Sequence, residues 1–158
     1  MAYAEGTSVA FEKSIAEIIG LVRKKGAEQI GQMEGADSYL ITFRLTDRVI
    51  RFTVPFKTLD EMPKLDGWRN PLTDAQRRDK LEAWKRQRGR ALLLVIKAKL
   101  ESVESGIETI EQAFLSQVVM ADGLTVYERI RTAVAVEYDT GRPSVALLPP
   151  PQTGGTLV

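Results

Sequence analysis

Residues 73–106 read TDAQRRDKLEAWKRQRGRALLLVIKAKLESVESG, a charged run followed by the most apolar run of the chain. Thr73 and Gln76 have the spacing of a capping box, in which each side chain satisfies a free backbone amide of the first helical turn. Gly106 follows the apolar run, at a position where glycine commonly ends a helix in the left-handed conformation. The stretch therefore predicts one long helix at the centre of the fold.

This helix is expected to pack through one face. At 100° per residue, one arc carries the apolar side chains of Leu81, Trp84, Ala91, Leu92, Val95, Ala98 and Val103. Residues 91–96 are apolar all round, so Leu93 and Leu94 need a second cover, either the C-terminal helices or another subunit. Leu93 and Leu94, together with Leu147 and Leu148 near the C-terminus, are the predicted oligomer-interface residues.

The first half of the same helix is basic. It carries Arg77, Arg78, Lys80, Lys85, Arg86, Arg88 and Arg90. The helix macrodipole favours cations at the other end, so helix stability does not explain this arrangement, whereas an anionic partner does. The competing interpretation is a solvated face with intrahelical pairs such as Glu82 with Arg86. The solvated face is the commoner situation, because only a minority of basic helices bind anything.

Composition limits the classes of function. The 158 residues, 44% of them hydrophobic, suit one domain, expected over 1–143, followed by an extended tail over 144–158. Basic and acidic residues number 22 and 21, so attraction to an anion must come from a local patch. The chain has no cysteine and no histidine, which excludes disulfides, thiolate metal sites and Ser/His/Asp catalysis.

The remaining motifs are also unlike those of an enzyme. No phosphate-cradling glycine loop and no arrangement of acids and lysine typical of a metal-dependent nuclease is present. The sequence therefore predicts a protein without catalytic residues, metal or cofactor. No apolar run approaches the roughly 18 to 20 residues of a membrane span. We accordingly expect a cytoplasmic protein with no membrane partner.

Outward from the central helix, the period of the sequence changes. A helix is predicted from a capping box at Ser14 and Glu17 to Gly26, and strands over 29–33, 38–45 and 48–54. After Gly106, capping-box spacings at residues 109 and 125 predict two short helices. The expected fold class is α+β: an N-terminal helix, a three-stranded antiparallel meander, the long helix, two short helices and a proline-rich tail.

A polar loop joins the last strand to the long helix and contains Trp68 between Lys64 and Arg69. An aromatic side chain among cations can stack on a nucleic-acid base. It can equally anchor the loop on the domain, and this second interpretation is the commoner one for tryptophan.

Two segments carry a resemblance to a known group of proteins. They are QRGRALLLVIKAKLESVESGIETIEQAFLSQVVMADGLTVYERI, residues 87–130, and VAFEKSIAEIIGLVRKKGA, residues 9–27. Both resemble a family of small uncharacterised proteins encoded by bacteriophages. The resemblance covers most of the chain and implies a phage origin and a place in the cytoplasm of the infected bacterium. It implies no activity.

Two function classes follow. The first is a non-enzymatic nucleic-acid-binding protein of phage DNA metabolism, of the single-strand binding or annealing type. The order of helix, three strands and basic helix is shared in outline by double-stranded RNA-binding domains and by annealing proteins, an argument by analogy. The predicted contact residues are Arg77, Arg78, Lys85, Arg86, Arg88, Arg90, Arg48, Arg51 and Trp68. The second class is an inhibitor or adaptor that binds a host or defence protein, with a homo-oligomer as one form.

Overall fold

The computed structural model describes residues 6–147 and confirms the predicted α+β fold. Helix α1 spans Phe11–Lys24 and precedes three strands, β1 Glu28–Glu34, β2 Ser38–Leu45 and β3 Arg48–Pro55. The long helix α2, Asp74–Glu104, is followed by α3, Ile110–Phe114, and α4, Val126–Thr140. Three short 3-10 helices are η1, Leu59–Glu61, η2, Leu115–Gln117, and η3, Val145–Leu147.

Capping decides where most of the helices begin. Thr73 and Gln76 bond reciprocally at the start of α2, and the same motif begins α3 at Thr109 and α4 at Thr125, as predicted. The predicted start of α1 at Ser14 is wrong. Ser14 is fully buried in the second turn, because the helix begins at Phe11, whose ring packs in the core.

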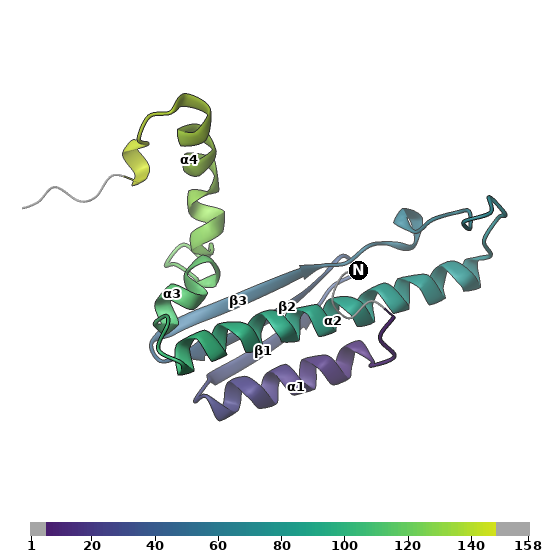
Figure 1. Ribbon diagram of the computed structural model, residues 1–158, viewed down its shortest axis with the longest axis horizontal. Helices are drawn as coiled ribbons and strands as arrows, with labels where there is room; N and C mark the ends of the chain where they lie inside the picture. Colours follow the sequence, from purple (N-terminus) through teal and green to yellow (C-terminus); the bar gives the residue numbers. More distant parts are fainter. Residues whose placement is uncertain (1–5, 148–158) are drawn as a thin grey trace, which may run out of the picture.

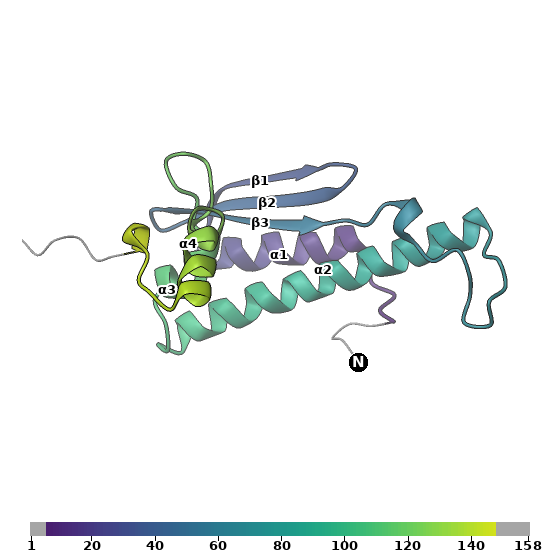
Figure 2. The ribbon, with the colours of Figure 1, turned by 90° about the horizontal axis from the view of Figure 1, so that it is seen from above.

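The strands form one antiparallel sheet in the order β1-β2-β3. Tyr39 lies opposite Val54 and Phe43 opposite Ile50, so the buried side chains of β2 and β3 share one face. Figure 2 shows α1 and α2 lying together against that face, while the opposite face is open over most of its length. The molecule is therefore a two-layer arrangement of one sheet and two helices.

Helix α2 packs through a different arc from the one predicted. Leu93, Ile96 and Leu100 are buried, whereas Val95 is 44% exposed. The predicted arc assumed cover by the sheet alone, but α1 also packs along one flank of α2 and shifts the buried arc toward itself. Leu93 is therefore covered by its own chain and is not available to a second subunit.

The two helices approach most closely at Gly89. A Cβ atom at this position would lie 2.9 Å from the Phe11 ring and 3.1 Å from the Ser14 Cβ. The glycine that weakens α2 as an isolated helix is thus what allows α1 to lie against it.

The C-terminal helices are attached at one end of the sheet. Val118 bridges to Ile50, and the Val119 amide donates to the Val49 carbonyl at 2.8 Å. Helix α4 then projects away from the two layers (Figure 1) and has no buried residue. Residues 145–147 form η3 rather than the extended start of a tail, and the rest of the predicted tail lies outside the described residues.

Candidate nucleic-acid interface

The basic half of α2 extends beyond the end of the sheet, beside η1 and the loop that follows it (Figure 1). Within this half, Arg77 is 9% exposed and donates from Nη2 to the Leu59 carbonyl at 2.6 Å. Arg77 therefore fastens η1 to α2 and is not accessible to a phosphate. Arg86 donates from Nε to the Thr7 carbonyl at 3.3 Å, and a carbonyl does not neutralise its charge.

Three other predicted contact residues form ion pairs with carboxylates far away in the sequence. The nitrogen–oxygen distances are 3.0 Å for Arg90–Glu17, 2.8 Å for Arg48–Glu111 and 2.9 Å for Arg51–Glu128. Each pair joins two elements, α2 to α1 in the first case and β3 to the C-terminal helices in the other two. A cation beside a carboxylate adds little net field, so these arginines are weaker candidates for phosphate binding than the sequence indicated.

Cations and aromatic rings gather where the chain leaves β3. We call Phe56, Lys57, Trp84, Lys85 and Arg88 the β3-exit cluster. The Arg88 guanidinium carbon lies 4.8 Å from the centre of the Trp84 ring, and Lys57 Nζ lies 5.7 Å from it. Lys85 Nζ lies 4.9 Å from the centre of the Phe56 ring, which meets Trp84 edge to face. Cation–π attraction thus holds Lys57, Lys85 and Arg88 close to one another.

The local sequence explains this cluster. Trp84 and Arg88 are four residues apart on α2, which places both side chains on one face of the helix. Phe56 follows β3 directly and is 6% exposed, so it fixes Lys57 beside the same face. Two carboxylates bear on the cluster. Glu82 lies 3.9 Å from Lys85 Nζ, and the pKa of Glu61 is lowered by hydrogen bonds from Thr58 and further by the charge of Lys57. The three cations therefore outnumber these carboxylates and leave a net positive charge.

The loop over residues 64–72 is closed by its own hydrogen bonds. Leu65 bridges to Pro71, and the Asp66 carboxylate accepts from the amides of Trp68 and Asn70, each at 2.8 Å. The hydrogen bonds from Asn70 lower the pKa of Asp66. Trp68 is 88% exposed at the tip. The interpretation of Trp68 as an anchor of the loop is therefore wrong. Hydrogen bonds to the Asp66 carboxylate hold the loop closed, and the indole is exposed to solvent.

Two members of the β3-exit cluster were among the predicted contact residues, Lys85 and Arg88. Phe56, Lys57 and Trp84 were not, although the spacing of Trp84 and Arg88 was a signal that the sequence contained. Arg78 is exposed on α2. Among the predicted oligomer residues, Leu94 is 39% exposed, Leu147 is half-buried, and Leu148 lies outside the described residues.

Comparisons with known proteins found no matching protein family, no matching curated protein and no matching solved structure. The resemblance to small phage proteins therefore stays a prediction. Within residues 6–147, no three acidic side chains are grouped so that they could hold a metal ion. In the same part of the chain, no helix combines the length and apolarity needed to cross a bilayer.

Proposed function

We propose that this protein binds single-stranded nucleic acid, without catalysing a reaction on it, through the β3-exit cluster. The observation that carries the proposal is that Lys57, Lys85 and Arg88 all lie against aromatic rings, and that within residues 6–147 only Lys85 also forms an ion pair, at 3.9 Å from Glu82. In a chain with a net charge of only +1, attraction of an anion depends on such a local group of cations. When the phosphates of a nucleic acid bind there, their condensed counterions are released into solution, so the affinity depends on the salt concentration.

The exposed indole of Trp68 favours single strands as the ligand. A tryptophan at the tip of a closed loop presents a flat apolar surface to solvent, and unpaired bases stack on such surfaces. Bases inside a duplex are already stacked on each other and are not offered to a side chain. Figure 2 shows this loop beyond the end of the sheet, on the side of the N-terminal end of α2. In the cell, this activity serves phage DNA metabolism by binding or annealing single strands.

Fluorescence anisotropy with labelled single-stranded and double-stranded DNA and RNA over a salt series tests the proposal. Three phosphate contacts give a slope of log affinity against log salt of about −2, since each contact on a single strand contributes about 0.7. Arg88→Glu is expected to reduce both the affinity and the slope. Arg131→Glu, the same charge change on exposed α4, is the matched control and should leave both unchanged.

Trp68→Ala separates stacking from phosphate binding. Removing one stacked aromatic costs about 1–3 kcal/mol of binding free energy but releases no counterions, so affinity should fall while the salt slope stays constant. Absence of binding to every strand at low salt would reject the nucleic-acid function.

Helix α4 favours the second function, an inhibitor or adaptor that binds a host or defence protein. Tyr127, Val134 and Tyr138 lie on one face of this helix and are 59%, 38% and 87% exposed. Apolar side chains gathered on a projecting helix are typical of protein contacts. A single stoichiometric partner, retained from host lysate by the full chain and lost by Tyr127→Lys/Tyr138→Lys, would support this function.

A further inference from the structure

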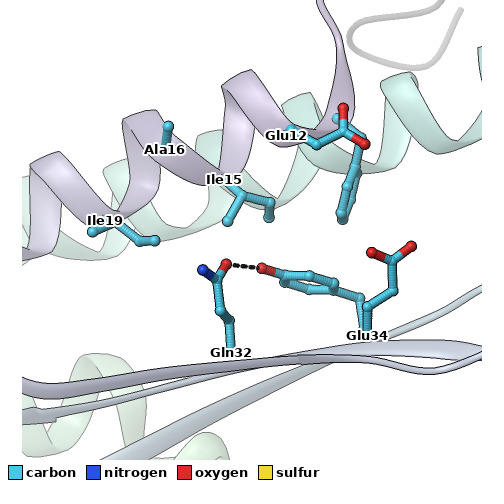
Figure 3. Close-up of a pocket in the computed structure, with 8 residues that line it drawn as sticks. Glu12, Ile15, Ala16, Ile19, Gln32 and Glu34 are labelled. Atoms are coloured by element: carbon cyan, nitrogen blue, oxygen red, sulfur yellow. Dashed lines mark hydrogen bonds between the residues drawn. The ribbon is translucent and has the colours of Figure 1, made fainter.

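A groove lies between α1 and the edge strand β1. Its cavity has a volume of about 360 Å³. Ile15, Ala16 and Ile19 of α1 and Gln32 and Glu34 of β1 line it; in Figure 3, Ile15 and Ile19 lie on the side of the helix toward β1, whereas the Ala16 methyl points away from the strands. The Tyr39 hydroxyl donates to Gln32 Oε1 at the floor of the groove.

The groove exists because α1 does not cover the whole inner face of the sheet. Gln32 pairs with Ile41, and Glu34 pairs with Tyr39, so both side chains share the face that carries the core. Both residues are nevertheless exposed, whereas Ile41 and Tyr39 are buried. In addition, β1 pairs with β2 alone among the described strands, which leaves its other edge with backbone groups that can accept another strand.

The two walls contribute carboxylates at the same end of the groove. Glu12 of α1 and Glu34 of β1 point toward that end from opposite sides (Figure 3). Neither forms an ion pair within residues 6–147. Burial raises the pKa of Tyr39, and the nearby charge of Glu34 raises it further, which agrees with a carboxylate close to the phenol. The groove is therefore acidic at one end, with apolar side chains of α1 along the rest and the Tyr39–Gln32 hydrogen bond at its floor.

We propose that this groove binds an extended segment of a partner protein, which adds to the sheet as a strand beside β1. Side chains of a strand alternate between its two faces, so every second residue of the segment faces α1. A lysine or arginine opposite Glu34 lies between the two carboxylates. An aliphatic residue two positions away lies against Ile15 and Ile19. The recognised motif is thus cation-x-aliphatic in an extended conformation.

The negative charge of the groove argues against two other ligands, a nucleic acid and a second copy of this chain. Two unpaired carboxylates repel a nucleic acid, so this surface is separate from the proposed nucleic-acid site. A second copy of β1 reads EQIGQME and has no cation, so pairing two copies through this edge brings like charges together. An extended basic segment is the occupant that satisfies the apolar wall, the carboxylates and the free edge at once.

NMR titration of the isotope-labelled full chain tests the inference. The probe is a short peptide with Lys-Thr-Ile at its centre, flanked by alternating threonine and valine. We expect amide shifts confined to residues 12–19 and 31–34. Because each exposed ion pair contributes about 0.2–1 kcal/mol and the variant removes both carboxylates, Glu12→Gln/Glu34→Gln should weaken binding roughly two- to thirtyfold.

Matched variants keep the result interpretable. Gln32→Phe, at an exposed position of β1 whose side chain enters the groove, fills it and should abolish the shifts while the fold remains intact. Glu101→Gln/Asp139→Asn removes the same charge from α2 and α4 and should leave the affinity unchanged. Shifts outside the groove, equal binding of a peptide with glutamate in place of lysine, no shifts at all, or dimerisation through β1 would each overturn the inference.

Discussion

The two halves of α2 are one continuous helix with opposite relations to the rest of the molecule. The C-terminal half places Leu92, Leu93, Ile96 and Leu100 in the core. The N-terminal half extends beyond the sheet, and apart from the buried Arg77 its cations lie on aromatic rings, beside carboxylates, on the Thr7 carbonyl or in solvent. The core packing and the proposed nucleic-acid site thus lie in separate parts of the same helix, and this separation can be tested by changing one part at a time.

The largest expected effect comes from the C-terminal half. Ile96→Ala removes a side chain with no exposed surface and leaves a cavity between α2 and the sheet. The free energy of unfolding should fall by about 2–5 kcal/mol, measured by urea denaturation. Under conditions where this variant stays folded, nucleic-acid affinity should be unchanged. A parallel loss of affinity would show that the two halves are coupled.

A smaller effect is expected at Gly89, where the two halves meet. Replacing glycine by alanine inside a helix normally stabilises it by up to about 1 kcal/mol. Here the added Cβ would lie 2.9 Å from the Phe11 ring, so Gly89→Ala should lower the free energy of unfolding by about 1–3 kcal/mol.

Gly20→Ala is the control for that substitution. A Cβ at Gly20 in α1 has no neighbouring atom within 4 Å, so this variant should be more stable than the parent chain. Stabilisation by both substitutions, seen in thermal and urea denaturation, would contradict the close packing of α1 on α2 at Gly89.

In the N-terminal half of α2, a substitution should change nucleic-acid affinity more than stability. Arg88→Ala removes a half-solvated guanidinium from Trp84, which should change the free energy of unfolding by no more than about 1 kcal/mol. Nucleic-acid affinity should nevertheless fall, as measured by anisotropy at fixed salt. Loss of several kcal/mol of stability in this variant would mean that the β3-exit cluster is part of the core.

The smallest effect is a local one with a defined pH dependence. The pKa of Asp66 is lower in the folded chain than in the unfolded chain, so its carboxylate stabilises the loop above the unfolded pKa. That contribution is lost as pH falls through the lower, folded pKa. The protection of the Trp68 and Asn70 amides, expressed as exchange relative to the intrinsic rate at the same pH, should fall in acid below the ordinary aspartate range. Asp66→Asn should show fast exchange at neutral pH, and identical profiles for both proteins would contradict the role of the carboxylate.

Local rules predicted much of this fold. The starts of α2, α3 and α4 follow from threonine capping boxes, and the meander follows from a period of two in residues 38–54. The buried arc of α2 could not be predicted in the same way, because it depends on which elements cover the helix. Only the packed structure shows that α1 lies along the flank that contains Leu93.

The candidate site was predictable in part for the same reason. Charge and spacing identified Lys85 and Arg88 on α2. The ion pairs that occupy Arg90, Arg48 and Arg51 join residues separated by 73, 63 and 77 positions, and no spacing rule reaches that far. Lys57 enters the site because the loop after β3 returns the chain to α2. Trp68 was recognised, but its exposure depends on the hydrogen bonds of Asp66.

The hydrogen bonds that the Asp66 carboxylate accepts also determine which substitutions the loop tolerates. The loop is closed by one carboxylate, two backbone amides and a short bridge, and the Trp68 side chain takes no part in any of these contacts. The Trp68 side chain is therefore not needed to fold the loop. Position 68 is a graft site that accepts any amino acid except proline, which has no amide hydrogen to donate to Asp66.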